Sequence, residues 1–261
     1  MEWSRERIWE TALAQSAVDI GCEPADFLRG EPVVTLARTA PGARRDLARP
    51  LDCHLVSYGN NVVAAAGEAY REIVWDYLRR FPPEHCFDTP HIHVLNSALE
   101  AAGSRVCFMT SYFLPDLTAL EPLPCPYPVR VLRQADFAAL YTDDWSNALC
   151  AKRRELDVLG IGAYDGETLV GLAACSADCG TMRQIGIDVL PAYRRQGIAA
   201  ALTSRLALAV LDQGLVPFYG AAWCNIRSVR NASRSGFRPA WAEVTAKPAA
   251  FVEELNRGRG R

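Results

Sequence analysis

QIGIDVLPAYRRQGIAA, residues 184–200, reads as a strand, a short loop and the start of a helix. Ile185, Ile187 and Val189 alternate with smaller or more polar residues, as expected of a pleated strand. Pro191 lacks the N–H that a strand ladder requires, so we expect the strand to end before it. This strand–loop–helix unit is the reference point for the rest of the chain.

The loop of this unit has the composition of an anion site. A helix start carries unpaired N–H groups and a partial positive charge. Gly197 and Ala199 leave the backbone accessible, and Arg194 and Arg195 add two positive charges beside the same turn. The sequence therefore predicts a pyrophosphate site here. The alternative is a glycine-containing turn with surface arginines.

The surrounding elements follow a regular order from about residue 127. Asp165-Gly166 is a strong hairpin signal, and Gly214 suits the end of the helix that starts near Ile198. The pattern predicts strands over 129–132, 159–164, 168–175, 184–189, 216–223 and 239–245, and helices over 135–149 (with a break at Asp143-Asp144), 198–213 and 226–235.

Residues 193–199, YRRQGIA, resemble the acetyl-CoA loop of the GNAT acyltransferases. Asn225 with Ser228 three residues later, followed by Gly236-Phe237, matches a second piece of that family. The resemblance covers about residues 127–247. It implies an α/β fold with a mixed sheet, in which a GNAT acetyltransferase domain spans residues 127–248.

The resemblance also implies a cofactor site for acetyl-CoA. The strand before the loop offers backbone groups to pantetheine, the loop binds the pyrophosphate, and Asn225 faces the pantetheine arm. For Asn225 a helix cap is the alternative, and the two roles are compatible. The residues expected to bind acetyl-CoA are Ile187, Val189, Arg194, Arg195, Gln196, Gly197, Ile198, Ala199, Ala200 and Asn225.

The catalytic groups depart from the family pattern. Many GNAT enzymes use a tyrosine as the acid for the leaving thiolate, and Ala232 stands at that position. Ser228 is the replacement that we predict, with Ser233 or water as alternatives. Asp188 is the predicted general base, acting through water, with an ordinary strand-end carboxylate as the alternative.

The expected function is acetyl transfer from acetyl-CoA to the amine of a small molecule. Two alternatives stay open: a CoA-binding regulatory or sensor module without turnover, and a protein or peptide N-acetyltransferase.

Composition limits the other classes of partner. The 261 residues carry a net charge of −2, which gives no overall attraction to nucleic acid or an anionic membrane. No apolar run reaches the ~20 residues that span a bilayer, so we expect a cytoplasmic protein. The nine cysteines predict free thiols, and no spacing of cysteines or histidines predicts a metal site.

The first half of the chain contains no motif that we can relate to chemistry. We expect a smaller α/β domain over residues 1–122, either a degenerate GNAT-like half or a cap that shapes the acceptor site. Four prolines within 120–128 predict an extended connector. Arg44, Arg45 and Arg49 fall in a stretch expected to be a solvated loop, with a phosphate patch as the alternative. The predicted helices cover 8–20, 70–81 and 90–102, and the predicted strands 33–36, 53–58, 62–66 and 105–113.

Overall fold

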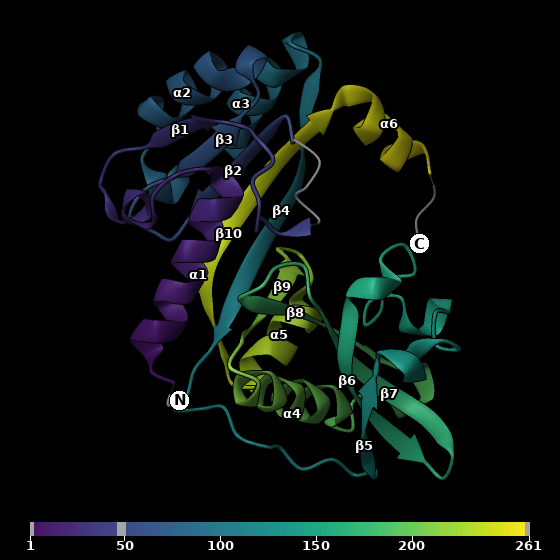
Figure 1. The fold of residues 1–261 in the computed structure, drawn as a ribbon. Helices are drawn as coiled ribbons and strands as arrows, with labels where there is room; N and C mark the ends of the chain where they lie inside the picture. The colour runs from purple at the N-terminus through teal and green to yellow at the C-terminus, as the bar shows by residue number, and fades with distance from the viewer. Residues whose placement is uncertain (1–2, 46–50, 259–261) are drawn as a thin grey trace. The chain divides into compact units, whose positions relative to one another are not determined.

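A computed structural model describes residues 3–45 and 51–258 (Figure 1). It confirms the mixed α/β class. The α-helices are α1 Arg5–Ile20, α2 Arg71–Arg80, α3 Thr89–Ala101, α4 Ile198–Asp212, α5 Ile226–Arg234 and α6 Ala249–Arg257. The strands are β1 Val33–Leu36, β2 Cys53–Ser57, β3 Val63–Ala66, β4 Ser104–Pro115, β5 Val129–Arg133, β6 Asp157–Asp165, β7 Thr168–Ser176, β8 Met182–Val189, β9 Val216–Ala222 and β10 Phe237–Pro248.

The chain divides into two compact units, and each is discontinuous in sequence. Unit 1 comprises the residues up to Ala12 together with Tyr112–Pro239, and unit 2 comprises Leu13–Ser111 with the residues from Ala240 onward. The chain passes from one unit to the other within α1, β4 and β10. The predicted pair of domains, 1–122 and 127–248, stays a prediction.

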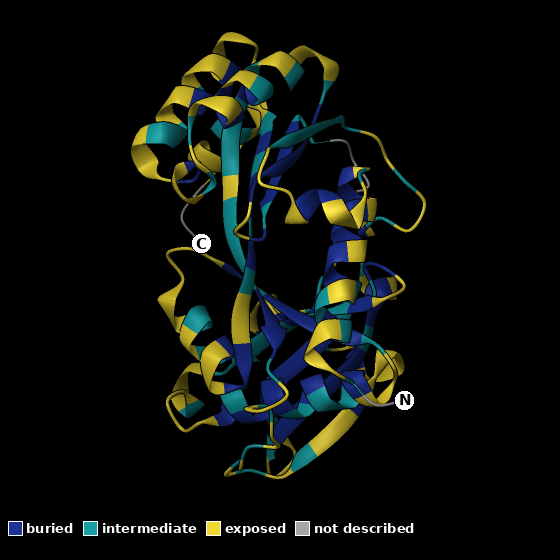
Figure 2. Ribbon diagram, turned by 90° about the vertical axis from the view of Figure 1, so that its left-hand side faces the viewer, coloured by how far each residue is buried: buried dark blue, intermediate teal, exposed yellow. Residues whose placement is uncertain are grey.

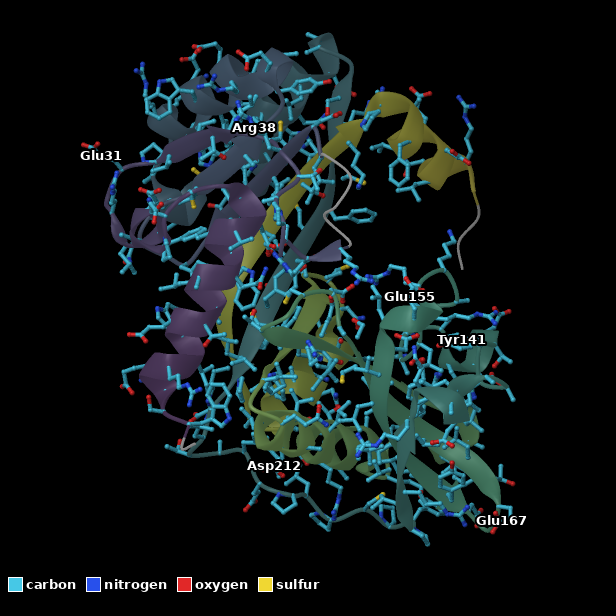
Figure 3. All side chains as sticks on the ribbon, in the orientation of Figure 1. Glu31, Arg38, Tyr141, Glu155, Glu167 and Asp212 are labelled. Carbon is cyan, nitrogen blue, oxygen red and sulfur yellow. The ribbon has the colours of Figure 1, made fainter. Side chains whose placement is uncertain are left out.

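Unit 1 contains the strand, loop and helix start of residues 184–200. Its strands follow the order β4-β9-β8-β7-β6-β5. β5, β6, β7 and β8 pair antiparallel, whereas β8 and β9 pair parallel. β6 and β7 are mostly buried (Figure 2), and their hairpin turns at Asp165-Gly166 as predicted. At its tip, Glu167 forms an ion pair with Arg130 of β5 at 3.1 Å (Figure 3).

Helix α4 supplies much of the core of unit 1. The sequence predicts this helix, and its apolar residues at helical spacing, Ile198, Leu202, Leu206 and Val210, are all buried in one cluster with β6, β7 and β8. A Cβ on Gly171 of β7 would lie 2.8 Å from Cγ2 of Ile198. That glycine therefore permits the close packing of strand and helix.

The α-helix predicted over 135–149 is wrong. The segment instead contains the short 3-10 turns Gln134–Phe137 and Asp143–Trp145. Four of its apolar residues are buried nonetheless, in a cluster with Leu132 and Leu172: Phe137, Trp145, Ala148 and Leu149. The backbone N–H groups of Asn147 and Ala148 donate to the Asp188 carboxylate. These contacts with β8 replace part of the hydrogen bonding that a helix would supply.

Unit 2 has the strand order β1-β3-β2-β10-β4. All seven elements predicted before residue 115 are present, while α6 was not predicted. α2 and α3 pack on the strands through a core that includes Leu55, Val74 and Leu99. A pocket of about 470 Å³ opens beside α2, with Trp75, Arg79 and Phe81 among its lining residues.

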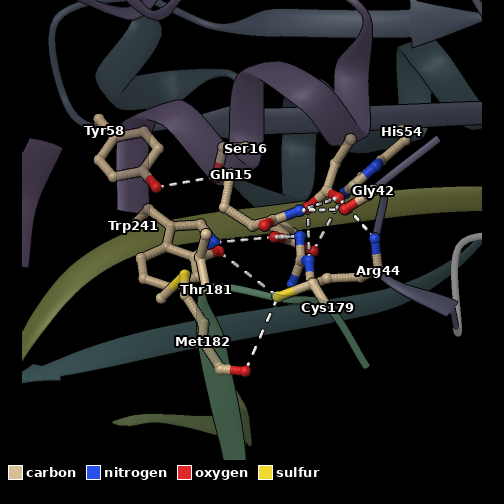
Figure 4. A network of polar contacts seen from close by, with 12 residues as sticks. Gln15, Ser16, Gly42, Arg44, His54, Tyr58, Cys179, Thr181, Met182 and Trp241 are labelled. Atoms are coloured by element: carbon tan, nitrogen blue, oxygen red, sulfur yellow. Dashed lines mark hydrogen bonds and ion pairs between the residues drawn. The ribbon is translucent and has the colours of Figure 1, made fainter. Parts of the chain in front are cut away.

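A buried ionic network joins four segments of unit 2 (Figure 4). Arg44 binds Asp19 through Nε at 2.5 Å and Glu243 through Nη2 at 2.7 Å. His54 Nε2 lies 3.0 Å from Glu243, whose other oxygen accepts from Trp241. Burial would raise the pKa of Glu243, but Arg44 and His54 hold that pKa well below its usual range. The solvated loop predicted for Arg44 is therefore wrong, because its side chain is 3% exposed; Arg49 lies outside the described residues.

Three further expectations concern the whole chain. All nine cysteines are free thiols, as predicted. Within residues 3–45 and 51–258, no helix is long and apolar enough to cross a membrane. The same residues contain no group of three or more His, Cys, Asp or Glu side chains arranged to hold a metal ion.

Candidate functional site

The site begins where β8 and β9 stop pairing. Their parallel register runs from Met182↔Val216 to Ile185↔Tyr219. Gly186–Val189 and Gly220–Ala222 lie beyond this register, whereas β8 remains paired with β7 as far as Val189. The facing edges of β8 and β9 therefore diverge past Ile185. Backbone groups on such edges need partners other than a strand ladder, and an extended ligand can supply them.

The loop between β8 and α4 has an unusual backbone. Arg194 is extended, Arg195 is left-handed at φ 64°, and Gly197 is left-handed at φ 84°. A left-handed arginine is uncommon. Left-handed residues in a tight loop turn backbone N–H groups toward a common side, the geometry of anion-binding concavities. Helix α4 begins directly after Gly197, so its first N–H groups add to that concavity.

Side chains join this loop to β8 and to the segment that precedes β5. Arg194 Nε donates to the Val189 carbonyl at 3.0 Å, which joins the loop to the end of β8. Gln196 accepts from the Tyr127 hydroxyl at 3.2 Å. The backbone at Gly197 is exposed, and a Cβ built there would meet no atom within 4 Å. The open side of the loop therefore has room for a ligand.

The predicted binding residues on β8 and α4 meet in one part of unit 1. Ile187 and Val189 pack against the same hydrophobic cluster that contains Ile198 and Tyr219. Ala199 and Ala200 are half-buried in the first turn of α4, and Gln196 is exposed in the loop.

Asn225 is the cap of α5. Its side-chain oxygen accepts from the backbone N–H of Ser228 at 3.2 Å. The capping alternative is thus confirmed, and the role toward pantetheine stays a prediction. Ala232 is fully buried on α5. The position where many GNAT enzymes carry a tyrosine hydroxyl therefore presents a methyl group to the core.

Asp188 holds the loop that includes the 3-10 turn Asp143–Trp145 against β8. Its carboxylate accepts from the Asn147 N–H at 2.8 Å, the Asn147 amide at 2.7 Å and the Ala148 N–H at 2.9 Å. Gly186 permits this contact, because a Cβ there would lie 2.0 Å from the Asn147 carbonyl oxygen. Asp188 therefore has a structural role, and its role as a base stays a prediction.

Sequence reasoning missed two residues of this region, Asn147 and Tyr219. For Asn147 the sequence predicts a helical position instead. Tyr219 forms the last registered pair with Ile185, and its hydroxyl lies 2.9 Å from Ser228 Oγ. The nine-residue separation of Tyr219 and Ser228 in sequence gives no local signal of that contact.

Comparisons with known proteins concern the fold and the family of the chain. No curated protein matches the sequence. A GCN5-related N-acetyltransferase from Kribbella flavida is 13% identical, covers 93% of this chain and 96% of its own, and has a TM-score of 0.51. A GCN5-related N-acetyltransferase-like protein from Streptococcus suis 89/1591 is 20% identical, with 78% and 86% covered and a TM-score of 0.48.

The Kribbella flavida protein shows the same fold along nearly the whole of both chains. The family model described as GNAT acetyltransferase matches residues 55–241, which is more than half of the sequence. That match includes the loop at Gly197 and both strands of the diverging pair. The chain therefore belongs to the GNAT acetyltransferase family.

Proposed function

We propose that unit 1 transfers the acetyl group of acetyl-CoA to the amine of a small molecule. The observation that carries the proposal is the loop Arg194–Gly197, left-handed at Arg195 and Gly197, at the start of α4 and beside the diverging edges of β8 and β9. Family membership supports acyl transfer in general. The proposal goes beyond family membership in two respects: it gives the acceptor as an amine of a small molecule, and it gives the location as the cytoplasm.

The predicted residues take the following roles. Backbone N–H groups of residues 195–200 bind the diphosphate, and the guanidinium groups of Arg194 and Arg195 add charge. Ile187 and Val189 offer backbone groups to the pantetheine arm along the free edge of β8, and Asn225 faces that arm from the start of α5. Binding at both places directs the thioester toward the end of β8.

The chemistry requires a neutral amine, a polarised carbonyl and a stabilised leaving thiolate. A backbone N–H near Val189 acts as the oxyanion donor. Asp188 takes the amine proton through water. Its carboxylate already accepts three hydrogen bonds, and since a carboxylate has about four lone-pair sites, one is left for that water.

A CoA-binding sensor without turnover is the second candidate. Ala232 favours it, since the buried methyl group offers no acid at the usual position. The CoA-binding residues are the same for both candidates, so CoA affinity alone does not distinguish them. Turnover of acetyl-CoA distinguishes the enzyme from the sensor.

Release of free thiol from acetyl-CoA tests the proposal. We expect release above the rate without an acceptor for at least one class in a panel of small amines, amino acids, aminoglycosides and peptides. CoA affinity is measured in parallel by calorimetry. Saturable CoA binding with no release for any acceptor would favour the sensor, and no CoA binding would contradict both candidates. A panel in which peptides alone react would contradict the small-molecule acceptor.

A further inference from the structure

Tyr219 is a buried tyrosine at the point where β8 and β9 diverge. It is 3% exposed, and its pair with Ile185 is the last in the parallel register. Its hydroxyl lies 2.9 Å from Oγ of Ser228, which is half-buried in the first turn of α5. A strand hydroxyl and a helix hydroxyl thus meet at the apex of the proposed pantetheine site.

The chemistry of the two hydroxyls sets the direction of their hydrogen bond. Burial raises the pKa of Tyr219, and hydrogen bonds with Ser228 and Asn231 limit that rise. The phenol therefore keeps its proton at neutral pH. A phenol is a stronger acid than an aliphatic alcohol, so Tyr219 is the better donor of the pair. A serine hydroxyl has one donor and two acceptor sites, so a Ser228 that accepts from Tyr219 keeps its own O–H to donate.

The surrounding contacts hold the pair in place. The backbone N–H of Ser228 donates to Asn225, which fixes the first turn of α5. Asn231, one turn further along α5, donates to Thr203 Oγ1 at 3.0 Å and so joins α5 to α4. Tyr219 itself packs against Phe237, with ring centroids 6.2 Å apart. Hydrogen bonds and packing thus connect the residues around the pair to α4, α5 and β10, which favours a fixed position for both hydroxyls.

We propose that Ser228 donates its O–H to the sulfur of the departing CoA, and that Tyr219 is the positioning residue that orients this hydroxyl. The inference rests on the proposed function. In the transfer, the amine nitrogen bonds to the carbonyl carbon, and the C–S bond breaks with its electron pair on sulfur. The thiolate accepts the hydrogen bond from Ser228. Asp188 takes the proton that the amine nitrogen loses, through water, and returns it through solvent to the sulfur, so Asp188, Ser228 and Tyr219 all end the reaction unchanged.

This arrangement compensates for Ala232. The buried methyl group cannot donate to sulfur, but a hydroxyl one helical turn earlier can. Donation from Tyr219 polarises the Ser228 hydroxyl, and such chains strengthen each bond in a site of low dielectric. A hydrogen bond that forms fully only on the thiolate stabilises the transition state more than the bound thioester.

The acidity of the CoA thiol in the complex provides a test that needs no acceptor. Ultraviolet absorbance of the thiolate is followed during pH titration of the protein saturated with CoA. We expect Ser228→Ala to raise the pKa of the bound thiol by about one unit or more relative to the wild type, since a hydrogen bond to a charged group is lost. Tyr219→Phe should raise it by about half a unit, and the double variant should match Ser228→Ala.

Matched variants separate this effect from loss of stability. Ser228→Thr keeps the hydroxyl and should retain the wild-type thiol pKa. Tyr58 and Ser16 form a second buried hydroxyl pair at 2.8 Å, in unit 2, so Tyr58→Phe and Ser16→Ala should lower Tm but leave the thiol pKa unchanged.

If Ser228→Ala and Tyr219→Phe both bind CoA and both keep the wild-type thiol pKa, the inference is overturned. The proposed cofactor site would still stand, because CoA binds. Tyr219→Phe can also be made in the Ser228→Ala protein. If it shifts the thiol pKa there as much as it does in the wild-type protein, the inference is overturned, because Tyr219 would then act without Ser228. Failure of the wild-type protein to bind CoA would remove the proposed function itself, and this inference with it.

Discussion

Gly197→Glu is expected to weaken CoA binding by about 100-fold or more, equivalent to ~2.7 kcal/mol. Gly197 is left-handed at φ 84°, a conformation that costs a residue with a Cβ roughly 1–2 kcal/mol. The substitution also places a carboxylate where we expect the diphosphate. Repulsion between the two anions and the loss of backbone hydrogen bonds account for the rest. Isothermal titration of CoA into the variant measures the effect.

Gly214→Glu is the matched control. Gly214 follows the other end of α4, whose last residue, Asp212, is labelled in Figure 3. It is left-handed at φ 76°. A Cβ there would also meet no atom within 4 Å. The control thus introduces the same side chain with similar strain away from the proposed site, and its CoA affinity should stay within about twofold of wild type. Equal affinities of the two variants would show that the loop does not bind the coenzyme.

Gly186→Ala is expected to destabilise the protein by about 3–5 kcal/mol. The new Cβ would lie 2.0 Å from the Asn147 carbonyl oxygen and 3.1 Å from the Ala148 Cα, both backbone atoms. The loop must move away from β8, and its three hydrogen bonds with Asp188 are then lengthened or lost. For a chain of this size the Tm should fall by about 10 °C, measured by calorimetry.

Gly180→Ala provides the comparison for that variant. No atom lies within 4 Å of a Cβ at Gly180, and its backbone is not left-handed. Its Tm should change by about 3 °C at most, since alanine is compatible with such a site. A Gly186→Ala protein as stable as Gly180→Ala would contradict the close contact between β8 and the 143–149 loop.

Local signals explain why the order of elements in unit 1 was predictable. Alternation marked β8, Asp165-Gly166 marked the hairpin, and the spacing of Ile198, Leu202 and Leu206 marked α4. Each of these signals lies within a few residues of the element that it predicts. Helix α6 has the same kind of signal, since its apolar residues recur at helical spacing, but it is not among the predicted helices.

Contacts between distant residues explain the failures. Residues 135–149 have helical spacing, but Asp188, 41 residues from Asn147, binds the backbone there. Arg44 reads as a loop arginine because its partner Glu243 lies 199 residues away. The proposed catalytic region follows the same rule. Family resemblance indicated the anion loop and Asn225, while the pairing of Tyr219 with Ser228 required the fold.

A crystal structure of the chain with bound CoA tests the central claim most directly. The predicted result places the diphosphate within hydrogen-bond distance of the N–H groups of residues 195–200, with the pantetheine arm along β8 beyond Ile185 and the sulfur beside Ser228. CoA bound elsewhere, for example in the pocket beside Trp75 and Arg79 in unit 2, with the loop at Gly197 free of ligand, would contradict it.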